Sequence, residues 1–240
     1  LANLITDSFG SCSQLTEISI VQNTQLTHLP AGFAQGCTKV TRFFLWVNNI
    51  QTLDREAFRG LDSLNHVILQ ANPITCIPPD LFSFTPNINN IQLGDCKISK
   101  IDPKTFTGLT KIEHIYLENN ELTELPKFDF TGTATAAQFN VINIYMYDNQ
   151  LNAIDPEFLS YFFGLNRYSV TIMLSIQYST KTNCVPSTVP TFISRNEWAQ
   201  ANMSMATCYN NWNPQTALTP VSCAATTTTS TTTTTTTTLA

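Results

Sequence analysis

The sequence predicts an elongated solenoid, in which similar short turns of chain stack on one another along one axis. The first observation is an apolar frame, L-x-x-L-x-L-x-x-N-x-L-x-x-L, that recurs in one phase within residues 15–175. The second is regular spacing, because successive centres of the frame lie 25, 24, 24, 24 and 29 residues apart. A repeat of this length indicates stacked supersecondary units. The centres of the six occurrences are Asn23, Asn48, Asn72, Cys96, Asn120 and Asn149.

The apolar positions of the frame predict one short strand in each repeat. In the segment 114–117, for example, Ile115 and Leu117 alternate with polar residues, and alternate side chains of a strand point to opposite faces. One repeat cannot bury these apolar side chains alone, so neighbouring turns stack into a continuous core. The central asparagine follows the strand, where its amide can satisfy backbone groups that lack a strand partner. We therefore expect the asparagine column to be structural rather than catalytic.

A second column supports the same frame elsewhere in each turn. Phenylalanine recurs about ten residues after most of the centres. A stacked aromatic column of this kind fills the convex side of a solenoid. The column consists of Phe33, Phe58, Phe82, Phe106 and Phe158.

This combination resembles the leucine-rich repeat family, whose period is about 20–29 residues and whose central position accepts asparagine or cysteine. The resemblance covers residues 15–175 and accounts for Cys96. It implies an α/β-type solenoid, a horseshoe with short parallel strands on its concave face. The 29-residue step contains the Thr/Ala/Gly insertion 127–138, which we expect to form a loop.

Extracellular members of this family commonly close both ends of the solenoid with disulfide-linked caps. The resemblance therefore implies an N-terminal cap at residues 1–14, repeats over 15–175 and a C-terminal cap at 176–223. Cys12 precedes the first repeat and Cys37 ends it, so we expect a disulfide that ties down the N-terminal edge. Disulfides at the caps imply an oxidising compartment.

The remaining cysteines suggest a second cap but no metal centre. No C-x-x-C pair occurs in the sequence, so zinc and thioredoxin-like sites have no support. We expect a Cys184–Cys208 bond after the last repeat, with Cys223 unpaired or bonded to another molecule. Cys96 lies at an inward position and is expected to be a buried thiol, without a bridge to Cys76.

The composition changes abruptly over residues 224–240, because positions 226–238 are all threonine except Ser230. A hydroxyl-rich run beside a secreted domain is typical of mucin-like, O-glycosylated stalks; an unmodified flexible linker is the alternative. Asn202 begins an N-x-S sequence and is a candidate for N-glycosylation. The candidate O-glycosylation sites are Thr226, Thr227, Thr228, Thr229, Ser230, Thr231, Thr232, Thr233, Thr234, Thr235, Thr236, Thr237 and Thr238.

Charge and motifs exclude several functions. Charged residues make up 12% of the chain, against about 25% in ordinary domains. The formal net charge is −5, which gives no electrostatic case for nucleic acid. No apolar run approaches the roughly 20 residues of a membrane-spanning helix, and no catalytic or cofactor motif occurs. His66 and His114 lie two repeats apart, about 10 Å, too far to share a metal ion, and we expect no cofactor.

The concave face is the informative surface. In each predicted strand the side chains that point away from the core can be read from the frame, and five of these eighteen are aromatic. Exposed aromatic patches mark contact sites, and Tyr and Trp are enriched among energetic hot spots. The alternative is that another part of the same chain covers this face. The candidate partner-binding residues are Arg42, Phe44, Trp46, His66, Ile68, His114, Tyr116, Tyr145 and Tyr147.

We therefore expect a secreted, non-enzymatic glycoprotein that associates with another protein or a glycan. The chain begins with Leu1 rather than methionine, as a processed secreted protein does, and attachment to a cell surface through a further C-terminal segment is compatible with the tail. The alternative function is a self-assembling subunit of an extracellular fibre or matrix, because head-to-tail contacts that do not close generate filaments.

Overall fold

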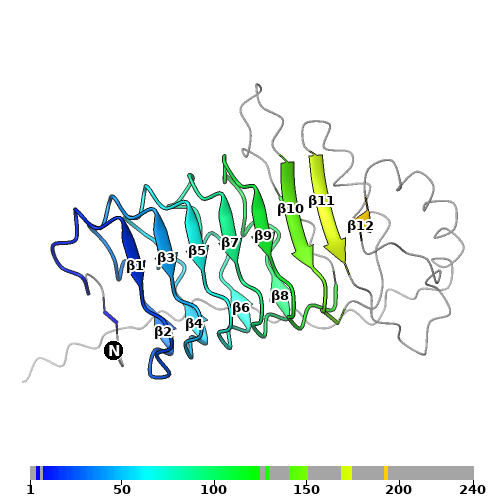
Figure 1. Ribbon diagram of the computed structural model, residues 1–240, viewed down its shortest axis with the longest axis horizontal. Helices are drawn as coiled ribbons and strands as arrows, with labels where there is room; N and C mark the ends of the chain where they lie inside the picture. Colours follow the sequence, from blue (N-terminus) through cyan, green and yellow to red (C-terminus); the bar gives the residue numbers. More distant parts are fainter. Residues whose placement is uncertain are drawn as a thin grey trace, which may run out of the picture.

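The chain winds as a solenoid of parallel strands, which follow one another in chain order across one sheet (Figure 1). Within the described residues the structure contains strands and turns but no helix, and the inserted segment 127–138 lies largely outside them. The computed structural model describes residues 4–5, 8–124, 128–129, 141–150, 169–174 and 192–193.

The main sheet has eight strands, of which the first seven are parallel and follow successive turns of the chain. Consecutive strands pair in parallel from β1 to β11, and β12 pairs with β11 in the antiparallel sense. Two parallel strands can be neighbours only if the chain returns from the end of one to the start of the next. The segments between successive strands of the main sheet make this return. The strands are β1 (Glu17–Ser19), β3 (Arg42–Phe44), β5 (His66–Ile68), β7 (Asn90–Gln92), β9 (His114–Tyr116), β10 (Val141–Met146), β11 (Ser169–Leu174) and β12 (Phe192–Ile193).

Shorter strands pair along a second side of the solenoid, below the main sheet in Figure 1. They form two parallel two-stranded sheets, β2–β4 and β6–β8. Their bounds are β2 (His28–Leu29), β4 (Thr52–Leu53), β6 (Cys76–Ile77) and β8 (Lys100–Ile101). Two pairs of neighbouring repeats are therefore joined by strand pairing at a second place besides the main sheet.

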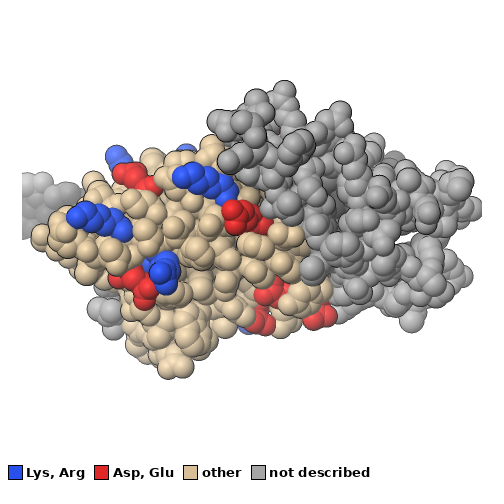
Figure 2. All heavy atoms as spheres, turned by 45° about the horizontal axis from the view of Figure 1, so that its top comes forward, with Lys and Arg blue, Asp and Glu red and all other residues tan. Residues whose placement is uncertain are grey.

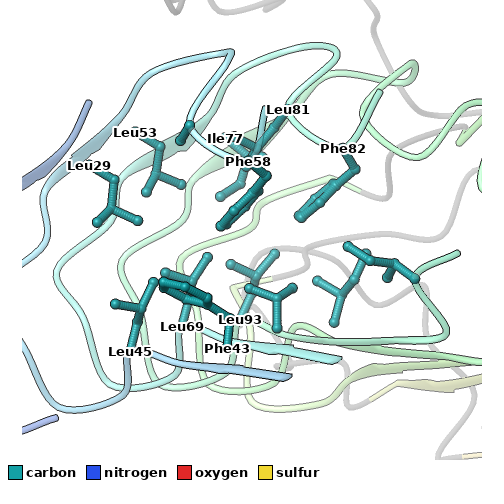
Figure 3. Packing of buried hydrophobic residues seen from close by; sticks show 14 of the residues in the cluster. Leu29, Phe43, Leu45, Leu53, Phe58, Leu69, Ile77, Leu81, Phe82 and Leu93 are labelled. Atoms are coloured by element: carbon teal, nitrogen blue, oxygen red, sulfur yellow. The ribbon is translucent and has the colours of Figure 1, made fainter. Parts of the chain in front are cut away.

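The core runs continuously between these two sides. Leu45, Leu69 and Leu93 occupy equivalent positions in three successive repeats and are fully buried (Figure 3). Three members of the predicted phenylalanine column, Phe58, Phe82 and Phe106, stack in succession, and the rings of Phe58 and Phe82 lie nearly parallel with their centroids 5.8 Å apart (Figure 3). The ring of Phe43 lies between Phe58 and Phe33 and contacts both. Aromatic contacts of this kind add to the stabilisation from buried area.

One member of the phenylalanine column was missed from the sequence. Phe128 is buried and packs edge-on against Phe106, with ring centroids 4.9 Å apart. It lies eight residues after Asn120 rather than ten, next to the insertion that lengthens this repeat. Phe158, which the spacing also assigned to the column, lies outside the described residues.

The buried asparagines link successive repeats through backbone hydrogen bonds. Asn72 Nδ2 donates to the carbonyl oxygens of Leu45 and Leu69, each at 2.8 Å. Its Oδ1 accepts from the Ile50 N–H at 3.0 Å, so one side chain satisfies groups of two repeats. Three further centres make closely related bonds, namely Asn48, Asn120 and Asn149.

Cys96 occupies the same position with fewer bonds. Its thiol donates weakly to the carbonyl oxygens of Gly94 and Leu69, at 3.4 and 3.6 Å. The Ile74 N–H, equivalent to the Ile50 N–H above, donates instead to the Asn72 backbone oxygen. Cys96 is a buried free thiol, as the sequence predicts.

A left-handed residue precedes every one of the six centres. Backbone φ at these positions lies between 53° and 57°, a region that L-residues other than Asn and Asp rarely adopt. The chain uses it to turn sharply out of the strand. The residues are Gln22, Val47, Ala71, Asp95, Asn119 and Asp148.

The N-terminal edge of the core is covered by a short cap. Cys12 and Cys37 form the disulfide that the sequence predicts, and the ring of Phe9 lies 6.2 Å from that of Phe33. Cys76 is also part of a disulfide bond. Its partner is not Cys96, which is a free thiol, and this agrees with the prediction that no bridge joins Cys76 to Cys96. The expected Cys184–Cys208 bond, Cys223, Asn202 and the threonine run lie outside the described residues.

Candidate partner-binding surface

Outward side chains form three rows across the main sheet, on the face that the sequence predicts to be concave. These three rows are called the sheet face. Inward side chains alternate with these outward ones, and the inward ones are buried in the core. The first row contains Glu17, Arg42, His66, Asn90, His114 and Asn143. The second contains Ser19, Phe44, Ile68, Gln92, Tyr116 and Tyr145. The third, aligned by backbone hydrogen bonds beyond the strand ends, contains Trp46, Gln70, Gly94, Glu118 and Tyr147.

All nine candidate binding residues lie on the sheet face, but they form two groups rather than one. The N-terminal patch consists of Phe44, Trp46 and Ile68, on β3 and β5 and the residues that follow β3. Trp46 is 39% exposed, whereas the other two are half-buried. Beside this patch the Arg42 guanidinium lies 3.7 Å from Glu17, and both side chains are largely exposed. His66 continues the first row next to Arg42.

The tyrosine patch consists of His114, Tyr116, Tyr145 and Tyr147, at the other end of the described face. The rings of Tyr116 and Tyr145 are stacked, with centroids 4.4 Å apart and planes 4° from parallel. The His114 ring lies 6.0 Å from Tyr116 and 6.3 Å from Tyr145. Tyr147 is 40% exposed. The paired rings of Tyr116 and Tyr145 form one flat aromatic surface, with the His114 ring tilted beside it.

The column of β7 separates the two patches with small and polar side chains. Asn90 and Gln92 are half-buried. Gly94 occupies the third-row position of this column and has no side chain there. A Cβ atom at position 94 would lie only 2.5 Å from Glu118 Oε1 and 2.8 Å from its Cδ. The Glu118 side chain therefore crosses from its own strand and occupies the space that Gly94 leaves.

Gly94 and Glu118 are not among the candidate binding residues predicted from the sequence, although both occupy outward positions of the repeat frame. A glycine at an outward strand position often marks a close approach of another group, so the signal was present. Its partner was not identifiable, because the contact joins neighbouring repeats.

Glu118 is electrostatically unusual. Burial is the main cause that raises the pKa of its carboxyl above the ordinary value, and the nearby Asp95 carboxylate raises it further. The Oε2 atom is buried and has no hydrogen-bond partner among the described residues. A carboxylate in this position costs free energy until a donor reaches it.

The neighbouring tyrosines respond to the same negative charge. Burial raises the pKa of Tyr147, and the carboxylates of Glu118, Asp148 and Asp95 add to the rise. Burial also raises the pKa of Tyr116, with contributions from Tyr145 and Glu118. The raised pKa values keep the hydroxyl groups of Tyr116 and Tyr147 neutral throughout the physiological pH range.

The histidines of the first row lie apart. The register places Asn90 between His66 and His114, as the sequence predicts. His66 Nδ1 lies 2.7 Å from Asn65 Oδ1. Burial lowers the pKa of His66, and the Arg42 charge lowers it further.

Metal-binding clusters and membrane-spanning helices are both absent from the described residues. These residues contain no group of three His, Cys, Asp or Glu side chains arranged to hold a metal ion. In the same part of the chain no helix is long and apolar enough to cross a bilayer. On the face shown in Figure 2, charged side chains lie in small groups with wide uncharged areas between them. This surface is suited to apolar and hydrogen-bonded contacts rather than to long-range attraction of a strongly charged ligand.

Comparison with known proteins agrees with this geometry. Comparison with curated protein sequences finds no match. Among solved structures, the crystal structure of a TLR13–ssRNA13 complex is similar in fold, with a TM-score of 0.51 and 14% sequence identity. The similarity covers 69% of this chain and 26% of that chain, so this chain spans about a quarter of that protein's length.

The family assignment follows from the sequence match. The leucine-rich repeat family model matches residues 13–74, 62–122 and 86–134. Together these matches extend from residue 13 to residue 134, which is just over half of the 240 residues. The chain belongs to the leucine-rich repeat family.

Proposed function

We propose that this protein is a secreted, non-enzymatic glycoprotein that associates with a protein partner through the aromatic residues of the sheet face. A glycan is the alternative ligand for the same face. Leucine-rich repeat domains act in general as scaffolds for protein–protein interaction, and solenoids present extended surfaces of this kind. The finer proposal concerns which surface is used and where the protein works.

The observation that carries the proposal is the exposure of large aromatic side chains in the third row. Trp46 and Tyr147 are 39% and 40% exposed, one in each patch. A sheet face without a partner would be expected to carry small polar residues there. Trp and Tyr supply much of the binding energy at protein interfaces, so these two residues are the proposed anchors.

The proposed location and modifications rest on other features. The Cys12–Cys37 disulfide is favoured by an oxidising compartment. The threonine run at residues 226–238 and the sequon at Asn202 supply acceptors for O-linked and N-linked sugars. In this proposal the glycosylated tail extends from the solenoid and presents the sheet face away from its attachment point.

The proposal is tested on natural secreted material by size-exclusion chromatography with light scattering. We expect a complex of fixed stoichiometry between this chain and a different protein. The double variant Trp46→Ala, Tyr147→Ala should weaken that complex by at least about thirtyfold, because one hot-spot residue contributes about 2 kcal/mol. Circular dichroism should show an unchanged fold.

The matched control is Phe84→Ala, because Phe84 is a half-buried aromatic in a return turn, away from the sheet face. It should leave the complex intact. Equal loss in both variants, or retention in both, contradicts a role for the sheet face. Long regular particles of this chain alone would instead make it a fibre subunit, and a complex lost on removal of the partner's sugars would identify a glycan ligand.

A further inference from the structure

We propose that the free edge of β1 is an interface at which two copies of this chain pair through their own β1 strands, antiparallel and related by a twofold axis. β1 is the first strand of the main sheet and pairs with β3 on one side only, at the left end of the sheet in Figure 1. An uncovered sheet edge is a template for pairing with another chain. The interface is separate from the contacts with a different protein, so it goes beyond the proposed function.

The first argument is the direction of the backbone groups of β1. The Ile20 N–H donates to the Phe44 oxygen, on the side of β3, at 2.8 Å. Successive residues of a strand direct their N–H and C=O groups to alternate sides, so those of Glu17 and Ser19 face away from β3. In the part of the chain that the structure describes, these groups of Glu17 and Ser19 have no hydrogen-bond partner on that side.

The second argument is that the N-terminal cap is attached elsewhere. The Cys12–Cys37 disulfide joins it to the first repeat. The Ser8 N–H donates to the Phe33 oxygen at 2.9 Å, and the Phe9 ring packs against the Phe33 ring. Phe33 and Cys37 both belong to the segment that returns from β2 to β3. The described cap residues therefore cover the end of the core but leave the edge of β1 unpaired.

The third argument is an apolar side chain that remains uncovered beside this edge. Leu15 occupies the first inward position of the repeat frame and is 43% exposed. No earlier repeat covers it, whereas the equivalent side chains of the next four repeats are fully buried. Ile5 of the cap adds exposed apolar surface at the same end of the solenoid. A chain that covers these side chains gains free energy from the area it removes from water. The four buried equivalents of Leu15 are Val40, Leu64, Ile88 and Ile112.

The opposite end of the sheet indicates which strand of a second copy pairs with β1. There β12 pairs in the antiparallel sense with the side of β11 that faces away from β10. Copies that extended the sheet head to tail would need this side of β11 to be free. Pairing of β1 with β1 uses the same surface on both copies, as a twofold interface does, and it closes at a dimer.

The residues of β1 fit antiparallel pairing with themselves. When Ile18 lies opposite Ile18 of the second copy, Glu17 lies opposite Ser19 of the second copy, and each such pair exchanges both N–H···O bonds. This register brings inward apolar side chains together and places no like charges opposite each other, which would be destabilising. Both cores then lie on the same side of one continuous sheet, so the sheet faces of the two copies form one surface.

The first test is the association state of the full chain, measured by size-exclusion chromatography with light scattering. At about 100 µM chain, a hundred times a micromolar Kd, we expect the mass of a dimer. The second test is amide hydrogen exchange. The amides of Glu17 and Ser19 should exchange much more slowly in the dimer than after dilution to the monomer, because only the dimer gives them acceptors. The Ile20 amide, which bonds within the chain, should change little.

A backbone variant tests the paired edge directly. Ser19→Pro removes an N–H that faces the free edge, and proline is tolerated at such edge positions. The dimer loses this bond twice by symmetry, so its Kd should rise about tenfold or more. Ser19→Ala is the matched control, because it keeps the N–H and should dimerise normally. Circular dichroism should show an unchanged fold in both variants.

A side-chain variant tests the apolar part of the interface independently. Leu15→Asn should raise the dimer Kd about tenfold or more, because each copy loses buried apolar area. The matched control is Val47→Asn, which replaces an apolar side chain of similar exposure, 40%, in the turn after β3. It should leave the Kd unchanged.

The outcomes separate this proposal from the proposed function. A monomer at about 100 µM, fast exchange of the Glu17 and Ser19 amides in the dimer, or equal Kd values for Leu15→Asn and Val47→Asn would each overturn the β1 interface. These three results apply even if Ser19→Pro does not fold. If the chain alone is monomeric and Ser19→Pro loses the complex with a different protein, that protein supplies the strand, and pairing with a second copy is wrong.

Discussion

Replacing Asn120 with alanine tests the hydrogen-bonded column that joins the repeats. Asn120 Oδ1 accepts from the Ile98 N–H at 2.9 Å, and its Nδ2 donates to the Leu93 and Leu117 oxygens at 2.8 and 3.1 Å. The Leu117 oxygen also accepts from Asn149 Nδ2 at 2.8 Å and keeps that bond. The substitution therefore leaves two buried groups, the Ile98 N–H and the Leu93 oxygen, without their side-chain partner.

The size of the effect follows from those two groups. A buried donor or acceptor that loses its partner costs about 1–3 kcal/mol, so Asn120→Ala should lower the free energy of unfolding by at least about 2 kcal/mol. In a protein of this size the apparent melting temperature should fall by roughly 4–8 °C. Unfolding need not be all-or-none in a solenoid, because each repeat contacts only its neighbours, so the melting curve should also broaden.

The assay is thermal and urea unfolding followed by circular dichroism. The matched control is Asn87→Ala, because Asn87 Nδ2 donates to the Asp62 oxygen at 2.9 Å in an exposed bond, where water can replace the amide. This control should change stability by less than about 1 kcal/mol. A melting curve of Asn120→Ala that matches either the unchanged protein or the control would refute the structural role of the column.

Two further predictions concern residues next to the same column. Val47 is a β-branched residue with a φ of 55° and a side chain that is 40% exposed, so Val47→Asn should raise the free energy of unfolding by about 1 kcal/mol, since asparagine adopts this conformation more readily. A lower melting temperature would contradict the assigned strain. Burial raises the pKa of the Cys96 thiol to about 11, so this thiol is protonated at neutral pH and should resist iodoacetamide in the folded protein. Peptide mass spectrometry should find Cys96 alkylated only after unfolding, and equal alkylation in both states would show that the site is open.

The repeat frame was sufficient to predict the solenoid because its information is local and periodic. Spacing alone places Ile115 and Leu117 inward and Tyr116 outward, and the structure has them so. The Cys12–Cys37 bond also followed from position, because the two residues flank one repeat. The same spacing missed Phe128, since the insertion shifts the chain where the phenylalanine column continues.

The backbone conformation before each centre and the side-chain contacts between repeats could not be predicted from the spacing of the repeats. The left-handed residue before each centre is Gln, Val, Ala, Asp or Asn, so no residue type marks it, and the turn is imposed by the strand and the buried centre on either side. The division of the aromatic residues into two patches depends on which side chains become neighbours across the sheet.

The sequence by itself determined the stacked repeats, the inward and outward sides of each strand and the column of buried centres, because these depend on a period that every turn repeats. Only the tertiary structure decided that Glu118 lies across Gly94 with one oxygen unsatisfied, and that Tyr116 stacks on Tyr145. These contacts join residues about 24–29 positions apart, and they arise when burial of the shared core brings neighbouring turns into register.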